Sequence, residues 1–328
     1  MHDYLLSLLL GIVEGLTEFL PVSSTAHLRI SEALLHIHLD DPFWKMYSIV
    51  IQLGAILCLP IYFRARIARI LDTVQSGAIG LLVLLCWLPF CLFCLPAWVA
   101  AFKRAMGASR SNNDNRTALT HPLSLVMIAF VFTAVPSLLL TKLIGKHLES
   151  LTVMGVSLLV GGVIMWIVDA HFGSPRTVGR HMTERMEDVT LFQAIWIGIC
   201  QVASAVFPGT SRSMSTIAAG QVAGMSRTAA LEFSFFLSMP TMIAATGYDL
   251  LRTFHPKHGA EALGRMPMDG HEWTVLLIGF VISFIVALAV VAWFMNWVRQ
   301  RGFTPFAIYR IAIGIAVLVW VIKGHGTH

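Results

Sequence analysis

The chain is poor in charge, since Asp, Glu, Lys and Arg make up 12% of its 328 residues, whereas soluble domains carry roughly a quarter. Apolar residues gather instead in seven runs, each near the ~20 residues that a helix needs to cross a bilayer. These runs cover residues 45–63, 78–102, 122–141, 151–168, 228–248, 274–298 and 303–322. The shortage of charge excludes an ordinary soluble enzyme. It predicts an all-α polytopic membrane protein with a single integral domain over residues 1–328.

Cysteine is also scarce, and a basic leader is missing. All five cysteines lie in apolar segments. Cys91 and Cys94 form a C-x-x-C without a second pair or a nearby histidine, so we interpret them as packing residues rather than metal or redox groups. The first three residues carry no basic charge and Glu14 interrupts the first apolar run, so we expect no cleavable signal peptide.

The net charge of +5 indicates membrane orientation rather than a nucleic-acid partner. We place four loops in the cytoplasm, together with Arg227. One loop follows residue 63, one precedes residue 122, one follows residue 168, and one separates the last two runs. Thirteen basic residues then lie inside and seven outside, as the positive-inside rule requires. We therefore expect the bilayer as a partner and expect no nucleic-acid partner.

The run 78–102 differs from the others because basic residues flank both of its ends and Pro89 and Pro96 lie in its middle. Proline interrupts helical hydrogen bonding. We therefore predict a bent hairpin or interfacial segment that enters and leaves on the cytoplasmic side.

Two stretches repeat each other when the sequence is offset by 187 residues. Without a gap, residues 11–25 (GIVEGLTEFLPVSST) align with residues 198–212 (GICQVASAVFPGTSR). Each stretch has a short apolar helix, a proline-centred break, a hydroxyl cluster and a second short helix. Paired interrupted helices at matching positions of two halves indicate a binding site near the membrane midplane.

With the predicted orientation, residues 1–35 begin and end outside, whereas residues 188–226 begin and end inside. The two broken segments then enter from opposite faces, as in an inverted-topology repeat, and their tips should meet where unwound backbone lines a cavity. The first half covers about 1–170, with a variable insert at 78–116, and the second half about 188–328.

Glu14 and Glu18 are four residues apart, so on a helix they share one face. Two carboxylates at membrane depth repel, so one must be protonated or a cation must hold both. Mg²⁺ or Ca²⁺ suits such a pair. The alternative is that both acids are solvated charges in the headgroup region.

Past Pro21 the chain offers hydroxyls and an imidazole, namely Ser23, Ser24, Thr25 and His27. On a restarted helix Ser24 and His27 would lie side by side, which is the pairing that a nucleophile and its base need. The alternative is a set of capping hydroxyls with a histidine in a polar pocket.

The second tip carries Arg212 among the hydroxyls of Ser211, Ser213, Ser215 and Thr216. An arginine at membrane depth must meet an anion, and its planar fork and the helix start beside it suit phosphate oxygens. A structural ion pair with Glu18 is the alternative. Acids with a possible cation, a Ser/His pair and an arginine together indicate phosphoryl transfer on an amphiphilic substrate.

These residues resemble those of a known family. The stretches EGLTEFLPVSSTAH (14–27) and PGTSRS (208–213) are similar to the two signatures of the undecaprenyl-diphosphatase family, the bacitracin-resistance phosphatases of bacterial membranes. Further similar segments are VIQLGAI (50–56), EFSFFLSMP (232–240) and FTPFAIYR (303–310).

The resemblance implies an inverted repeat with two re-entrant helical hairpins in the bacterial cytoplasmic (inner) membrane, with the cavity facing the periplasm. It also implies a divalent cation and hydrolysis of undecaprenyl diphosphate, a polyprenyl diphosphate lipid, to the monophosphate carrier of cell-wall synthesis. The family's functional positions fall here on Glu14, Glu18, Ser24, His27, Ser211, Arg212 and Thr216.

We therefore assign Arg212 to the β-phosphate, helped by Ser211, Ser213 and Thr216. Ser24 is the expected nucleophile and His27 its base and later proton donor, with these two roles exchangeable. Glu18 would orient His27 or hold the cation with Glu14. Ser23 and Thr25 are further candidate substrate ligands.

Two residues depart from the family pattern, since Ala26 and Met214 stand where glycine is usual. Both are expected to fill space beside the phosphate. The alternative function is a lipid-phosphate transporter or flippase that uses the same site. The lipid phosphatases of the acid phosphatase superfamily are disfavoured because their K-x6-R-P, P-S-G-H and S-R-x5-H-x3-D motifs are missing.

Overall fold

The computed structural model describes residues 2–38, 41–74, 78–106, 119–140, 150–173, 182–254 and 268–323. These residues are helical almost throughout, and the β pairing among them is one isolated bridge between Thr183 and Met225. The prediction of an all-α protein is confirmed. Of the basic residues used for the orientation, those in segments 107–118, 141–149, 174–181 and 255–267 lie outside the described residues.

Six spans are long and apolar enough to cross a membrane, which confirms six of the seven predicted runs. The first joins α3 (Pro42–Ile56) to α4 (Cys58–Tyr62). The others are α8 (Pro122–Leu139), α10 (Leu151–Phe172), α14 (Arg227–Phe254), α15 (Gly270–Arg301) and α16 (Thr304–Ile322). Large apolar side chains on these helices face outward, among them Leu138, Ile285 and Ile308. Such outward faces suit contact with lipid.

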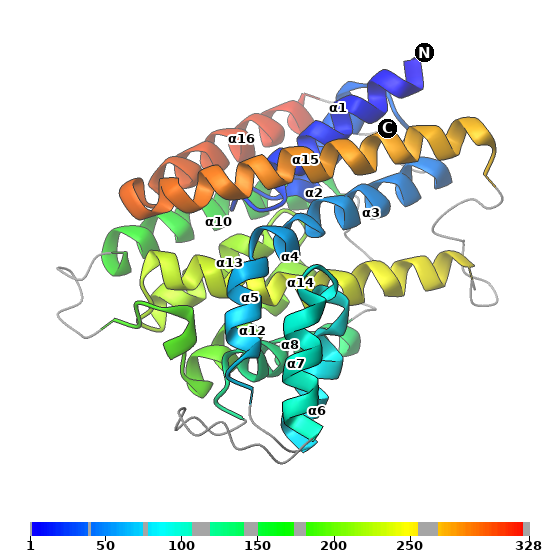
Figure 1. Cartoon of the computed structure of the whole chain (residues 1–328). Coiled ribbons are helices and arrows are strands. Elements are labelled where there is room, and N and C mark those ends of the chain that lie inside the picture. The colour runs from blue at the N-terminus through cyan, green and yellow to red at the C-terminus, as the bar shows by residue number, and fades with distance from the viewer. Residues whose placement is uncertain are drawn as a thin grey trace.

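The seventh run bends, as predicted. It forms α6 (Ala78–Trp87), the short 3₁₀ turns η1 (Leu88–Phe90) and η2 (Leu92–Cys94), and α7 (Leu95–Met106). The two arms are bent by 103° at the break, because Pro89 cannot donate a helical hydrogen bond. In Figure 1 the hairpin lies at the bottom of the molecule, where α7 contacts α5 (Arg64–Leu71) and α6 contacts α8. Cys91 and Cys94 are buried in its apolar core, as expected for packing residues.

Two helix–break–helix pairs occupy the positions of the sequence repeat. The first is α1 (His2–Thr17) with α2 (Ser24–Leu34), and the second is α12 (Leu191–Val206) with α13 (Arg212–Val222). The 3₁₀ turn η3 (Met186–Asp188) precedes the second pair. The helices before the breaks are both 16 residues long, and those after the breaks are both 11. Each pair thus places a break after a helix too short to span comfortably.

Glycine lets each first helix approach a helix from the other half of the chain. Helix α1 lies along α15 (Figure 1), and a Cβ at Gly11 would lie 2.9 Å from the carbonyl oxygen of Gly279. Helix α12 packs on α8 in the same way, where a Cβ at Gly198 would overlap the carbonyl oxygen of Ala129. Helices α10 and α16 pack along one another. These contacts bring the two breaks to the centre of the bundle.

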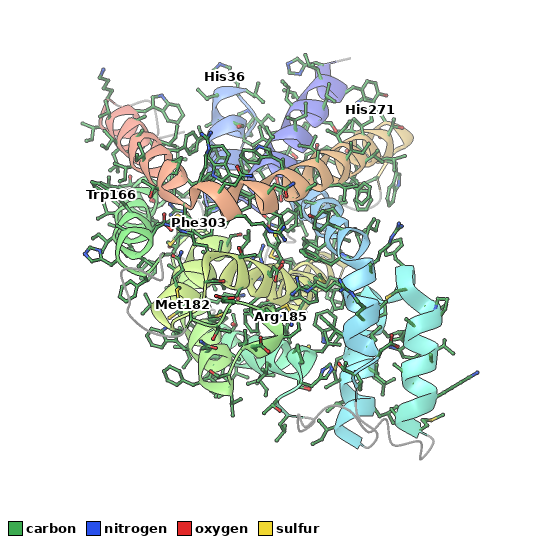
Figure 2. All side chains as sticks on the ribbon, turned by 60° about the vertical axis from the view of Figure 1, so that its left-hand side comes forward. His36, Trp166, Met182, Arg185, His271 and Phe303 are labelled. Carbon is green, nitrogen blue, oxygen red and sulfur yellow. The ribbon has the colours of Figure 1, made fainter. Side chains whose placement is uncertain are left out.

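Buried polar contacts join α10, α14 and the start of α16. Asp169 on α10 accepts hydrogen bonds from Arg227 on α14 and from the backbone of Phe303 and Thr304, so it caps α16 from a different helix. Figure 2 shows Met182 and Arg185 in the half of the molecule opposite His36 and His271.

Candidate active site

Each break is fixed by residues that cannot continue a helix. Helix α1 ends before Pro21, and Ser23 caps α2 with φ of 74°. Helix α12 ends before Pro208–Gly209, and Ser211 caps α13 with φ of 70°. A serine at positive φ is uncommon and costs about 1–3 kcal/mol, and such strain concentrates at functional sites. The two strained caps begin the helices that carry the predicted phosphate ligands.

The breaks differ in length by one residue, which shifts the predicted alignment. The first break covers residues 18–23 and the second 207–211. The ungapped alignment pairs Ser24 with Ser211, whereas in the structure Ser23 and Ser211 hold the same capping position. The structural counterpart of Ser24 is therefore Arg212, the first residue of the following helix.

Glu18 joins the two tips. One of its carboxylate oxygens accepts a hydrogen bond from the hydroxyl of Ser24 at 2.5 Å, and the other accepts from Arg212 at 3.1 Å. Its backbone carbonyl also accepts from the hydroxyl of Ser213 at 3.3 Å. The predicted meeting of the two tips is present, and the Glu18–Arg212 ion pair that the sequence offered as an alternative is part of it.

Glu14 lies one helical turn before Glu18 and is fully buried. Neither of its carboxylate oxygens has a hydrogen-bond partner among the described residues. A buried carboxylate without a donor is costly, so the site requires a proton or a cation here. The described residues hold no cluster of three or more His, Cys, Asp and Glu side chains that could bind a metal alone. A cation at Glu14 and Glu18 would therefore need oxygen ligands from substrate or water.

Arg212 is placed to receive an anion. Its side chain is 11% exposed, one terminal nitrogen donates to Glu18, and its Nε has no partner among the described residues. It is also the first residue of α13, where free backbone N–H groups and the helix dipole favour negative charge. These features fit a phosphate clamp whose donors are only partly used.

His27 is held by partners other than Ser24. Its Nδ1 lies 2.7 Å from the carbonyl oxygen of Ser23, so that nitrogen carries the proton, and its Nε2 lies 2.8 Å from the hydroxyl of Tyr309. The rings of His27 and Tyr309 stack with centroids 5.6 Å apart. The expected Ser24–His27 pairing is therefore replaced in this structure by Ser24–Glu18 and His27–Tyr309 pairs.

The remaining predicted hydroxyls bond mainly to the protein. Ser23 and Ser211 cap their helices by accepting from the backbone amides of Ala26 and Met214, and Thr216 bonds to the Arg212 carbonyl and to Ser234. Thr25 is exposed on the first turn of α2. The roles of Ser23, Thr25, Ser211, Ser213 and Thr216 as substrate ligands stay predictions. Their observed contacts shape the tips.

Tyr309 and Arg310 were missed as site residues. Both lie on α16, and the guanidinium of Arg310 donates to the backbone of both breaks, at Pro21 and at Gly209 and Thr210. The signal available in the sequence was Arg310 itself, which, like Arg212, is an arginine at membrane depth within an apolar segment.

The two departures from the family pattern, Ala26 and Met214, are both buried beside α10, and their expected effect on the phosphate site stays a prediction. Ala26 is buried in a cluster with Met154 and Leu158 of α10. Met214 is also buried, with its terminal carbon beside Gly161 of α10. Both side chains therefore pack on α10.

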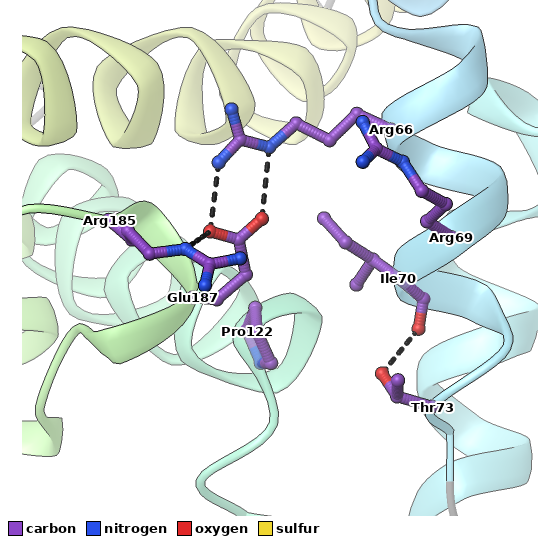
Figure 3. A pocket seen from close by; sticks show the side chains of 7 residues that line it. All are labelled: Arg66, Arg69, Ile70, Thr73, Pro122, Arg185 and Glu187. Atoms are coloured by element: carbon purple, nitrogen blue, oxygen red, sulfur yellow. Dashed lines mark hydrogen bonds and ion pairs between the residues drawn. The ribbon is translucent and has the colours of Figure 1, made fainter.

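A pocket of about 230 Å³ lies elsewhere, between α5, α8 and η3 (Figure 3). Arg66 holds Glu187 through two hydrogen bonds of 3.0 and 2.8 Å and donates to Glu232 at 2.6 Å. Burial alone would raise the pKa of Glu187, but the Arg66 hydrogen bonds outweigh it and hold that pKa below its usual range. The lining carries three arginines, Arg66, Arg69 and Arg185, against Glu187 alone, and none of the predicted site residues lines it.

Fold and site together define a multi-pass helical membrane protein with an acid–serine–arginine centre at two helix breaks. The family model described as "Bacitracin resistance protein BacA" matches residues 7–316. The chain is 59% identical to an undecaprenyl-diphosphatase of Koribacter versatilis over 98% of this chain and 100% of that protein. It is 36% identical to an undecaprenyl-diphosphatase of Caldanaerobacter subterraneus (94% and 93% covered) and 37% identical to one of Rhizobium etli (98% of each). The chain belongs to the BacA family of bacterial multi-pass membrane proteins.

Proposed function

We propose that this protein hydrolyses undecaprenyl diphosphate to undecaprenyl phosphate and inorganic phosphate. The substrate is the one in the names of its relatives. The observation that carries the proposal is Glu18, which contacts the hydroxyl of Ser24 on one tip and the guanidinium of Arg212 on the other. Nucleophile, proton acceptor and phosphate ligand thus meet at one point, as phosphoryl transfer requires.

Ser24 is the nucleophile. Its oxygen attacks the terminal phosphorus while its proton passes to Glu18, which lies within 2.5 Å, and the bond from that phosphorus to the bridging oxygen breaks to release the lipid monophosphate. Water then attacks the phosphoserine and releases inorganic phosphate. Ser24 recovers its proton from Glu18, and the proton of the water leaves with solvent.

Arg212 binds the terminal phosphate through its unpaired donors, with the start of α13 adding backbone N–H groups. We assign His27 to the leaving oxygen; a proton that its Nε2 gives to that oxygen is replaced from solvent through the Tyr309 hydroxyl, which lies 2.8 Å from Nε2. The exchanged assignment, with His27 taking the phosphoryl group and Ser24 assisting, uses the same contacts. The two assignments differ in which phosphorylated residue would be trapped.

Mg²⁺ or Ca²⁺ would be held by Glu14 and Glu18. The two unpartnered oxygens of Glu14 are buried next to Glu18, which fits a hard cation that prefers carboxylate oxygens. When bound, the cation supplies positive charge that neutralises the diphosphate oxygens. In its absence the Glu14 carboxylate needs a proton.

The two halves, about 1–170 and 188–328, form an inverted-topology repeat with re-entrant hairpins at the two breaks. The equal lengths of the paired helices and the matching strained caps support this proposal. So do Gly11 and Gly198, which are aligned in the sequence repeat and sit at reciprocal contacts, α1 on α15 and α12 on α8. A two-fold relation between halves exchanges these two contacts.

The protein lies in the bacterial cytoplasmic membrane with residues 64–73 and 182–190 inside and the catalytic cavity open to the periplasm. Arg66 and Arg185, from two loops predicted to be cytoplasmic, both contact Glu187. Gly302, in a third such loop, lies against Arg227. The predicted inner loops therefore meet at one end of the molecule, as a common membrane face requires.

The test is phosphate release by purified protein in detergent, with undecaprenyl diphosphate and Mg²⁺ or Ca²⁺. Wild type should release inorganic phosphate, and Arg212→Ala should lose at least about 10²-fold in rate per folded molecule. Absence of release by wild type across several polyprenyl diphosphates would favour the flippase alternative. Reconstitution in vesicles with a labelled lipid diphosphate then measures translocation directly.

A further inference from the structure

Arg310 is an arginine buried in the middle of an apolar helix. It lies on α16, and none of its surface is exposed. A buried arginine in a membrane span is costly unless its donors are satisfied. Yet Arg310 has no carboxylate partner in the part of the chain that the structure describes, and its charge is met by backbone carbonyl dipoles.

The four carbonyls belong to the helix breaks and their neighbour α10. One terminal nitrogen donates to Pro21 of the first break at 2.9 Å. The other donates to Gly209 at 3.1 Å and Thr210 at 2.9 Å in the second break, and to Ser157 of α10 at 3.2 Å. A carbonyl freed by a break needs a partner when it is buried. A single guanidinium therefore serves both breaks at once.

The packing around Arg310 leaves room for this fork and for little else. At Gly161 of α10 a Cβ would overlap the Arg310 guanidinium, and at Gly162 it would lie 3.0 Å from the Arg310 Cβ. The two glycines let α16 approach α10 closely enough for the guanidinium to reach between the tips. The side chain is thus held from its base to its end.

We propose that Arg310 is a positioning residue that sets the separation of the two tips, and through it the geometry of Ser24, Glu18 and Arg212. This inference rests on the proposed phosphatase function for its kinetic part. Arg310 touches neither Ser24 nor Arg212 directly in these contacts; it acts through Pro21, three residues before Ser24, and Thr210, two residues before Arg212.

The planar fork makes this role specific to arginine. The two terminal nitrogens of arginine have a fixed separation and can donate to both breaks at once. Lysine has a single ammonium group at the end of a shorter side chain. Arg310→Lys keeps the charge and most of the side-chain volume but must give up one break. A shift of about 1 Å between reacting groups can lower a rate by about 10²-fold.

The experiment compares Arg310→Lys with wild type and with Arg227→Lys in detergent. Arg227 is the control, because it also joins two helices but donates to Asp169 rather than to the carbonyls of the breaks, and its side chain is 30% exposed. The measurements are kcat and KM for phosphate release, the thermal midpoint, and amide hydrogen exchange of residues 18–24 and 207–213. Exchange reports local opening independently of catalysis.

For Arg310→Lys we expect kcat to fall about 10²-fold with KM changed less than about 3-fold. Exchange should rise in both breaks together while the rest of the chain keeps its protection, and Arg227→Lys should show neither effect. Unchanged exchange in the two breaks would overturn the proposal. It would also be overturned if exchange rose throughout the chain while kcat per folded molecule stayed at the wild-type value. If wild type releases no phosphate, the phosphatase function fails, and exchange at the two breaks still decides whether Arg310 holds them.

Discussion

Arg212 and Glu18 are 194 residues apart in sequence, yet the guanidinium of one lies 3.1 Å from the carboxylate of the other. The contact is nearly buried, with 11% and 4% of the two side chains exposed. Removing one partner of such a pair leaves an uncompensated charge and can destabilise the fold by about 3–5 kcal/mol. Substitutions here therefore need conservative variants and a stability measurement beside the kinetics.

Arg212→Lys separates charge from geometry at this contact. Lysine keeps the positive charge beside Glu18 but loses the planar fork that binds two phosphate oxygens. We expect kcat for phosphate release to fall about 10²-fold, with a thermal midpoint close to wild type. An Arg212→Lys enzyme that kept half of the wild-type rate would show that Arg212 is a structural ion-pair partner only.

Ser24→Ala should abolish turnover, because among the described residues the hydroxyl of Ser24 is the one that contacts the carboxylate of Glu18. The loss should reach at least about 10³-fold for removal of a nucleophile. Ser31→Ala on the same helix is the matched control and should retain wild-type activity. If Ser24→Ala keeps a slow reaction and traps phosphohistidine at His27, the exchanged assignment of the two residues holds.

Glu14→Gln tests the cation site. The amide removes one of two carboxylates, and the number of ligand charges governs the affinity of oxygen sites for Ca²⁺. The Ca²⁺ or Mg²⁺ concentration for half-maximal phosphate release should rise about 10-fold or more.

Although Glu14→Gln should weaken cation binding, it should not destabilise the fold. In EDTA its thermal midpoint should equal or exceed that of wild type, because wild type without a cation must protonate the buried Glu14 carboxylate, whereas the amide is neutral without a proton. Glu272→Gln, at the exposed start of α15, is the control and should leave the cation requirement unchanged. An unaltered cation requirement in Glu14→Gln would place the metal elsewhere.

Tyr309→Phe removes the hydroxyl that lies 2.8 Å from His27 and keeps the stacked ring. A neutral hydrogen bond contributes about 0.5–1.5 kcal/mol, so we expect kcat to fall roughly 2- to 10-fold. The pH dependence of kcat should also change, since Tyr309 contacts the nitrogen assigned to proton transfer. Tyr248→Phe on α14 serves as the control and should match wild type in both respects.

The sequence was sufficient for the spans and for the meeting of the tips because both rest on local signals. Span length follows from apolar runs. The breaks follow from Pro21 and Pro208, and their burial follows from glutamates and an arginine in otherwise apolar segments. The meeting of Glu18 and Arg212 was predicted from the repeat, on the proposal that the two breaks enter from opposite faces.

The sequence was insufficient wherever a contact depends on distant helices. Tyr309 and Arg310 reach the tips from α16, and their partners are chosen by packing that no local pattern encodes. The ungapped repeat also hid the extra residue of the first break, which moved the equivalent of Ser211 from Ser24 to Ser23. A loop can gain one residue without a change in the periodicity of its flanking helices, so only coordinates reveal that shift.

Gly11→Ala and Gly198→Ala should each destabilise the protein, because the new Cβ would collide with a backbone carbonyl of α15 or α8. Backbone cannot move aside as a side chain can, so we expect a loss of about 1–3 kcal/mol for each variant. Gly247→Ala on α14 is the control, since a Cβ there would meet nothing within 4 Å and alanine favours a helix by up to about 1 kcal/mol. Thermal unfolding in detergent measures all three. Equal losses at Gly11 and Gly198 would follow from reciprocal contacts of a two-fold repeat, whereas a loss at one position alone would argue that the two halves pack differently.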